Sequence, residues 1–465
     1  MSDIEHGERS RFQFSAEESG RPERAIVLVP EFSGRKEDKG SLPDASLSIN
    51  ASGQVLHRSG QSRLAEAEGL ARAISLDVVE SGLVPIKAMR PATLFGSGKV
   101  DEIAGTIKAG EIGLAIIDHP LSPVQQRNLE KAWNCKVLDR TGLILEIFGE
   151  RARTREGRLQ VELAHLNYQK GRLVRQWTHL ERQRGGLGKT GGPGETQIES
   201  DRRMLQERIL RLERDLEKVK RTRTLHRAKR KKIPTPVVAL AGYTNAGKST
   251  LFNRITGADV FAENQLFATL DPTLRKLQLP QGLEAILSDT VGFVSNLPTT
   301  LVAAFRATLE EVLEAELILH VRDVSDPDTA AQAADVYSIL AQLGIGQEGR
   351  ERVLEVWNKI DLLEPAALEA IRQTRGNVTE AGGPILVSAA TGEGTDELLR
   401  EIETRLAGIA EEIDIHLSLA EFDRIGWIYD NSQVLNRIDE EDGSVSLRVR
   451  IKPGLRDSFM RFMQG

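Results

Sequence analysis

One eight-residue pattern constrains this chain more than any other feature of its sequence. Gly242 is followed at the required spacing by Gly247, Lys248 and Ser249, which gives G-x-x-x-x-G-K-S. An apolar run, 237–241, precedes the pattern and an amphipathic segment follows it. Strand, glycine loop and helix in this order form a phosphate-binding loop, whose backbone N–H groups surround phosphates at a helix N-terminus. The sequence therefore predicts an α/β nucleotide-binding unit, with Lys248 at the β- and γ-phosphates and the Ser249 hydroxyl on Mg²⁺.

Two other glycine-rich stretches contain Gly-Lys and do not fit this pattern. In 184–196 the first glycine would fall on Gln183, and the preceding segment has a helical pattern. In 94–102 the first glycine is replaced by Thr93 and the hydroxyl residue by Val100. Neither stretch predicts a phosphate site.

Three further motifs follow the phosphate loop in a consistent order. Asp289 ends an apolar run and leads to Gly292, so its carboxylate can support Mg²⁺ and the glycine amide can meet a γ-phosphate. Asp361 closes an N-K-x-D motif, and its carboxylate can accept hydrogen bonds from N1–H and the N2 amine of guanine. Adenine lacks that amine, so the site should select GTP. In the stretch 388–390 a backbone N–H can bond guanine O6.

A loop that responds to the γ-phosphate needs a threonine whose hydroxyl binds Mg²⁺. The segment 261–276 offers Thr269 and Thr273. Many GTPases also place a glutamine directly after the D-x-x-G motif to orient the attacking water. Here that residue is Phe293, which cannot orient a water, so unaided hydrolysis should be slow.

Composition limits the classes of protein that this chain can be. A single cysteine, Cys135, excludes a disulfide framework and is expected to be a small buried apolar residue. No apolar run reaches the roughly 18 residues of a membrane-spanning helix, and the polar N-terminus has no signal-peptide core. We expect the cytoplasm as the location, on ribosomes or peripherally at the membrane.

Charge is concentrated in one part of the chain. Residues 151–232 hold 24 Lys and Arg against 10 Asp and Glu, whereas the whole chain carries −6. Leucines and other large residues recur in 4-3 spacing over 159–180 and again over 205–219. This repeat predicts two long helices, each with one apolar seam, that pair antiparallel as a basic hairpin. A basic segment in an acidic protein favours contact with nucleic acid.

The fold class expected for the chain is α/β. It comprises an N-terminal α/β subdomain with a long helical hairpin, a phosphate-loop domain with a mostly parallel sheet, and a small C-terminal α+β module. The expected segments are a disordered tail at 1–21, the α/β subdomain at 22–150, the hairpin at 151–232 with its glycine-rich tip at 183–196, the phosphate-loop domain at 233–410 and the C-terminal module at 411–465.

Residues outside the phosphate-loop domain carry a specific resemblance. The stretches 94–103, 118–130, 137–169, 185–203 and 305–311 resemble the HflX family, within the Obg/Era-like class of translation-factor GTPases. The resemblance implies a GTPase that binds the large (50S) ribosomal subunit and splits or rescues stalled ribosomes. It implies that the hairpin and its tip approach ribosomal RNA near the peptidyl-transferase centre, and that the ribosome stimulates hydrolysis. It also favours Thr269 over Thr273.

The motifs and the resemblance together give the expected site and partners. Catalytic roles fall to Lys248, Thr269 and Gly292, and Mg²⁺ binding to Ser249 and Thr269. The residues expected to bind GTP or GDP are Gly242, Tyr243, Thr244, Asn245, Ala246, Gly247, Lys248, Ser249, Thr250, Phe267, Ala268, Thr269, Leu270, Asp271, Asp289, Thr290, Val291, Gly292, Asn358, Lys359, Asp361, Ser388, Ala389 and Ala390. We expect a monomer. ATP use at the N-terminal domain is left open, although no phosphate-loop pattern precedes Gly242. An RNA-binding ribosome-assembly scaffold with a weakly active GTPase domain is the alternative reading.

Overall fold

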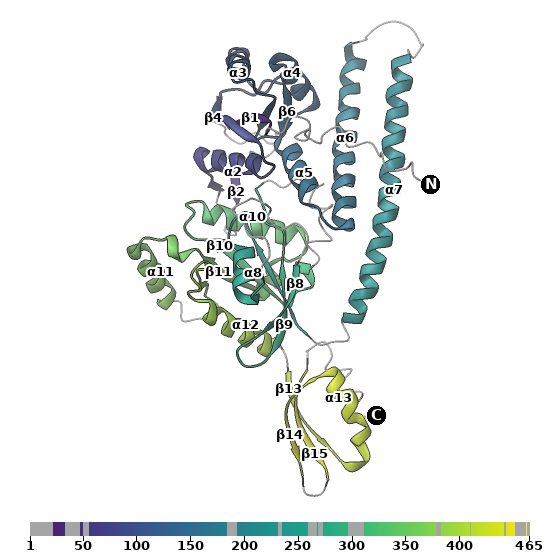
Figure 1. The fold of residues 1–465 in the computed structure, drawn as a ribbon, viewed down its shortest axis with the longest axis vertical. Coiled ribbons are helices and arrows are strands. Elements are labelled where there is room, and N and C mark those ends of the chain that lie inside the picture. Colours follow the sequence, from purple (N-terminus) through teal and green to yellow (C-terminus); the bar gives the residue numbers. More distant parts are fainter. Residues whose placement is uncertain are drawn as a thin grey trace.

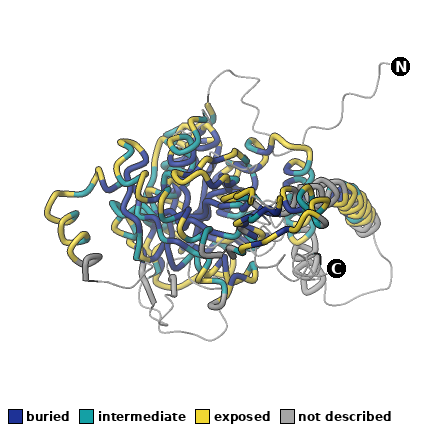
Figure 2. Tube along the Cα trace, turned by 90° about the horizontal axis from the view of Figure 1, so that it is seen from below, coloured by how far each residue is buried: buried dark blue, intermediate teal, exposed yellow. Residues whose placement is uncertain are grey.

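The computed structural model describes most of the chain in four units (Figure 1). The described residues are 22–32, 47–49, 55–183, 193–230, 235–258, 267, 273–295, 311–377, 383–409, 411–440, 443–451 and 462. We call the units the N-terminal unit (22–151), the hairpin (155–230), the phosphate-loop unit (235–409) and the C-terminal unit (411–462). Figure 2 shows buried residues gathered in the middle of the molecule and exposed ones around the rim.

The N-terminal unit is built on a four-stranded parallel sheet in the order β4-β1-β5-β6. The helix that begins at Pro123 is capped by Ser122, which forms a reciprocal capping box with Gln125. The elements are β1 (Arg24–Phe32), β2 (Leu47–Ile49), β3 (Val55–His57), α2 (Gly60–Arg72), β4 (Asp77–Ile86), α3 (Ser97–Ala109), β5 (Leu114–Ile117), α4 (Pro123–Trp133), β6 (Lys136–Asp139) and α5 (Arg140–Arg151). Cys135 is half-buried against this unit's core, and burial raises the pKa of its thiol to about 11.

The hairpin consists of two long helices that lie side by side (Figure 1), α6 (Arg155–Gln183) and α7 (Pro193–Arg230). Glu162 pairs with Arg208 at 2.7 Å and Lys170 bonds to Gln206, so the helices run antiparallel. The apolar seam predicted from the 4-3 spacing is present as a cluster of Leu159, Leu163, Leu166, Leu205, Ile209 and Leu212. Residues 184–192 of the predicted tip lie outside the described residues.

The phosphate-loop unit contains a six-stranded sheet in the order β12-β11-β10-β7-β9-β8. All neighbouring pairs are parallel except β8 with β9. The carboxyl ends of the parallel strands therefore meet at one edge, where α/β sheets bind ligands. The elements are β7 (Val237–Gly242), α8 (Lys248–Thr256), β8 (Thr273–Gln278), β9 (Glu284–Asp289), β10 (Leu317–Asp323), α10 (Thr329–Gln342), η1 (Gln347–Arg352), β11 (Val353–Asn358), η2 (Ile360–Leu362), α11 (Pro365–Asn377), β12 (Ile385–Leu386) and α12 (Thr395–Ile409).

The N-terminal and phosphate-loop units share one continuous hydrophobic core. Leu143 and Phe148 of α5 belong to the same buried cluster as Ala241 of β7 and Val336 of α10. The two units therefore pack through an extensive apolar interface.

The C-terminal unit is a small antiparallel sheet in the order β13-β15-β14. Its elements are β13 (Glu411–Leu417), η3 (Leu419–Arg424), α13 (Ile425–Asn431), β14 (Gln433–Asp439) and β15 (Val445–Ile451). After β15, only residue 462 of the expected C-terminal module is among the described residues. None of the helices that the structure describes is long and apolar enough to cross a membrane.

Candidate GTP site

The phosphate loop joins β7 to α8 and depends on two glycines. Gly242 has φ of 153°, and a Cβ atom there would lie 2.2 Å from the carbonyl oxygen of Val321. Gly247 has φ of 88°, and its Cβ would lie 2.2 Å from Nδ2 of Asn358. Any other residue would therefore displace a neighbouring strand end as well as strain the backbone.

Lys248 begins α8 and turns back over the loop. Its Nζ donates hydrogen bonds to the carbonyl oxygens of Gly242 at 3.0 Å and Tyr243 at 2.7 Å. The residue is 6% exposed. Burial lowers the pKa of Lys248 to about 8, although Asp289 opposes that shift. A phosphate group at the loop would supply the negative charge that restores the ammonium form.

Ser249 and Asp289 come together although forty positions separate them. The Ser249 hydroxyl donates to Oδ2 of Asp289 at 2.7 Å, and Asp289 is fully buried at the end of β9. A hydroxyl beside a carboxylate is an all-oxygen donor set, which suits Mg²⁺. These residues fit the predicted magnesium site.

The segment after Asp289 is fixed to the phosphate loop by backbone hydrogen bonds. Phe293 N–H donates to the Gly242 carbonyl at 3.1 Å, and Thr244 N–H donates to the Phe293 carbonyl at 2.7 Å. An added Cβ on Gly292 would lie 3.2 Å from Nζ of Lys248, so this glycine lies beside the lysine. The Phe293 side chain is 1% exposed and packs into the shared core. The side chain is therefore turned into the core.

Asn358 connects the phosphate loop to the loops after β11 and β12, where guanine is predicted to bind. Its Nδ2 donates to the Ala246 carbonyl at 2.8 Å, and its Oδ1 accepts from Ala389 N–H at 2.9 Å. The side chain of Asp361 is exposed one turn farther on, in η2. Lys359 pairs with Asp323 at 2.7 Å. Asn358 thus positions two loops, and Asp361 is the carboxylate that stays accessible to a base.

The threonine predicted to bind Mg²⁺ and sense the γ-phosphate is not among the described residues. Thr269 lies outside the described residues, as do Ala268, Leu270 and Asp271. Phe267 is described, and its ring packs edge-on against Phe148 of the N-terminal unit, with centroids 4.7 Å apart. The alternative, Thr273, is the first residue of β8 and pairs with Asp289 in the ladder.

Sequence reasoning missed the residues of the N-terminal unit that reach the phosphate loop. Arg58 and Glu66 bond to the hydroxyl of Tyr243, and Arg140 bonds to Ser295. Charged residues are ordinarily solvated, so nothing in the pattern distinguished these three. A bulky tyrosine inside the phosphate loop was the one available signal.

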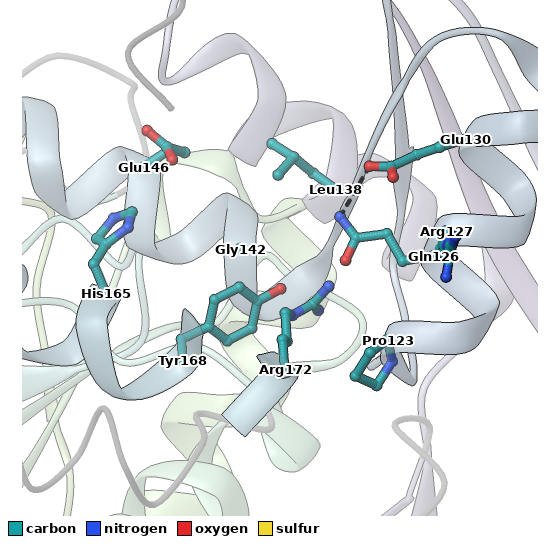
Figure 3. Close-up of a pocket in the computed structure, with 10 residues that line it drawn as sticks. All are labelled: Pro123, Gln126, Arg127, Glu130, Leu138, Gly142, Glu146, His165, Tyr168 and Arg172. Carbon is teal, nitrogen blue, oxygen red and sulfur yellow. Dashed lines mark hydrogen bonds between the residues drawn. The ribbon is translucent and has the colours of Figure 1, made fainter. Parts of the chain in front are cut away.

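A separate pocket of about 340 Å³ lies in the N-terminal unit and the base of the hairpin (Figure 3). Glu146 and His165 lie at one end and Glu130 at the other, with Tyr168 and Arg172 between them. It is also lined by Pro123, Gln126, Arg127, Leu138 and Gly142. The lining carries carboxylates as well as guanidinium groups and belongs to no phosphate-loop pattern. No phosphate-loop motif in the N-terminal unit supports the ATP use that the sequence left open.

Comparison with known families accounts for nearly the whole described chain. Residues 61–149 match the family "GTP-binding GTPase N-terminal", and 151–230 match "GTP-binding GTPase Middle Region". Residues 237–359 match "50S ribosome-binding GTPase", and 374–461 match "HflX C-terminal domain". GTPase HflX of Magnetococcus marinus is 47% identical over 414 residues, covering 89% of this chain and 94% of that protein. The chain belongs to the HflX family of GTPases.

Other HflX relatives align over similar lengths. GTPase HflX of Escherichia coli is 45% identical over 388 residues, covering 83% of this chain and 89% of that protein. Among solved structures, a GTP-binding protein from Sulfolobus solfataricus in complex with GDP is 20% identical and covers 82% of this chain and 98% of its own, with a TM-score of 0.42. The HflX relatives and the family match over 237–359 confirm the expected enzyme class, a GTPase.

Proposed function

We propose that this HflX-family GTPase binds the large ribosomal subunit through its basic hairpin and separates or rescues stalled ribosomes in a GTP-dependent cycle. The observation that carries the proposal is a basic antiparallel hairpin in the same chain as a GTP site. The family name "50S ribosome-binding GTPase" for residues 237–359 supports the choice of partner. The ribosomal RNA supplies the polyanion that a basic hairpin requires.

The proposed nucleotide contacts follow from the site geometry. Loop N–H groups between Gly242 and Gly247 bind the α- and β-phosphates, and Lys248 binds the β- and γ-phosphates. Asp361 accepts from guanine, while N–H groups of 388–390 donate to O6. Ser249 and Thr269 hold Mg²⁺, which neutralises charge on the phosphates when bound.

Hydrolysis would depend on the partner. Because Phe293 is turned into the core, a water beside the γ-phosphate has no side chain from this position to orient it. The ribosome, or a segment that it orders, would complete the site. GTP holds Thr269 and Gly292, hydrolysis releases them, and binding at the subunit interface favours separated subunits.

Cosedimentation with purified large subunits tests the hairpin as the binding element. Arg203, Arg211 and Arg214 are exposed on α7, and changing all three to Glu should weaken binding and reduce its salt dependence. The matched control changes the exposed Lys108, Lys131 and Arg400, outside the hairpin, to Glu.

The account predicts that only the hairpin variant loses binding, at a GTP-binding capacity equal to that of the unmodified chain. Equal losses in both variants would mean that net charge, and not the hairpin, brings the protein to RNA. Unchanged binding of the hairpin variant, with slow hydrolysis throughout, would favour the assembly-scaffold reading with another RNA-binding surface.

A further inference from the structure

A buried polar network extends from the N-terminal unit into the GTP site. Its centre is the hydroxyl of Tyr243, the residue that follows Gly242 in the phosphate loop. This hydroxyl accepts from Arg58 Nη1 at 2.9 Å and from the backbone N–H of Ser295 at 2.9 Å, and donates to Glu66 Oε2 at 2.6 Å. Tyr243 is 5% exposed, so water does not compete effectively for these bonds.

Arg140 also bonds to Ser295, in the segment that follows Gly292. Its Nη2 donates to the carbonyl oxygen of Ser295 at 3.1 Å and to the Ser295 hydroxyl at 2.9 Å. The guanidinium also pairs with Glu66 and Asp118, so its remaining charge is compensated. Both backbone polar groups of Ser295 are therefore bonded to side chains of this network, one through Tyr243 and one through Arg140.

Charge compensation makes the network a fixed feature of the folded protein. Burial alone would raise the pKa of Glu66, but Arg140 and Arg58 hold it at about 2. The carboxylate therefore stays ionised through the neutral range, and its bond from Tyr243 is charge-assisted. Removing one of its charged members would leave buried charge unpaired.

The N-terminal unit contacts residues close in sequence to Gly292 and Thr269, the two residues proposed to meet the γ-phosphate. Ser295 lies three positions after Gly292, which is next to Lys248. On the other side, Phe148 of the N-terminal unit packs on Phe267, two positions before Thr269. The N-terminal unit thus contacts the chain on both sides of the γ-phosphate position. Fixing the point where a loop leaves the site reduces the ordering needed in the transition state.

We propose that the Tyr243 hydroxyl is a positioning group for GTP hydrolysis. Anchored by Glu66 and Arg58, it holds Ser295 and thereby keeps Gly292 within reach of the γ-phosphate. The inference rests on the nucleotide site proposed above. Tyr243 touches the reacting phosphate only through its backbone, so the side chain acts through Ser295 and Gly292.

The decisive variant is Tyr243→Phe in the full chain, which removes one hydroxyl and keeps the ring in the shared core. We expect kcat to fall about tenfold, the scale of one hydrogen bond to a charged group, while KM for GTP changes less than about twofold. Glu66→Gln should lower kcat in the same direction. The double variant should be little slower than the slower single one, because both changes break the same contact.

The matched control is Tyr337→Phe. That hydroxyl, on α10, donates to Oε1 of Glu355 on β11 at 2.9 Å, so the control removes a tyrosine–carboxylate bond away from Ser295. It should lower thermal stability and leave kcat unaltered. A purely structural role for Tyr243 would instead make the two variants behave alike.

The proposal is overturned if Tyr243→Phe retains kcat within about twofold, or if its kcat falls no more than that of Tyr337→Phe at equal stability loss. If Tyr243→Phe does not fold, Glu66→Gln decides by the same criteria. Lys248→Ala separates this inference from the site itself: undiminished hydrolysis in that variant would refute the site, whereas its loss leaves the Tyr243 comparison to decide the positioning role.

Discussion

The side chain of Asn358 donates a hydrogen bond to the carbonyl oxygen of Ala246 at 2.8 Å and so ties the end of β11 to the phosphate loop. Its other amide atom accepts from Ala389 N–H, which adds the loop after β12. Three loops are thereby held in one arrangement, although Ala246 lies 112 positions and Ala389 31 positions from Asn358 in the sequence. Removing this side chain should therefore weaken the binding of both the guanine base and the phosphates.

Replacing Asn358 by Ala tests that connection. The change leaves the Ala246 carbonyl and the Ala389 N–H buried without this partner, at a cost of about 1–3 kcal/mol for each group. We expect GDP affinity, measured by calorimetry, to fall at least about tenfold. The control is Asn128→Ala, which removes an exposed bond to the Ala92 carbonyl. Affinity unchanged in Asn358→Ala would show that the loops keep their arrangement without it.

Asp361→Asn tests base recognition. The carboxylate accepts two hydrogen bonds from guanine, whereas an amide can accept one and must donate the other. We expect GTP affinity to fall by about 100-fold or more, because the amide NH₂ group of the variant would face an N–H donor of guanine. Xanthosine triphosphate, which carries an acceptor at that position, should bind the variant better than GTP does. Equal GTP binding by the variant and the unmodified chain would remove Asp361 from the site.

The lowered pKa of Lys248 predicts proton uptake on binding. In the empty protein burial holds this pKa at about 8, and a bound phosphate raises it. Binding GDP at pH 9 should therefore take up close to one proton, and affinity should fall as pH rises above about 8. Calorimetry in buffers of different ionisation enthalpy measures the uptake. No uptake at pH 9, together with constant affinity, would contradict a neutral lysine in the empty site.

Phe148 should influence catalysis as well as stability. Phe148→Ala should lower the free energy of unfolding by about 3–5 kcal/mol, as large-to-small core changes do. The control Phe95→Ala empties a buried position beside Trp133 in the same unit, away from the phosphate loop. Only the Phe148 variant should also lower kcat, because its partner Phe267 leads to Thr269. The same kcat for both variants at matched stability would show that Phe148 contributes to core stability and not to catalysis.

Local motifs allowed much of this arrangement to be predicted from the sequence. The spacing of Gly242, Gly247 and Lys248 between an apolar run and a helix indicated where phosphates bind, because backbone geometry there depends on residue type. The 4-3 spacing of leucines likewise predicted the hairpin seam, which the pairing of Leu163 and Ile209 within one cluster confirms.

Elements shaped by long-range contacts escaped prediction. Strand β4, Asp77–Ile86, was missed because it is an edge strand with mostly exposed or half-buried side chains and no clear alternation. Strand β8 was missed because only its pairing with β9 organises it. The ion pairs of Arg140 depend on Glu66 and Asp118, which are distant in sequence, and no local pattern marks such partners.

The most direct measurement of the central claim is GTP hydrolysis with and without purified large ribosomal subunits. It compares the intact chain with a variant in which 185–194 are replaced by a short serine linker. The account predicts that subunits accelerate the intact protein and leave the variant near its unaided rate. No acceleration of the intact protein would contradict the account, because Phe293 would then leave its hydrolysis slow on the ribosome as well as off it.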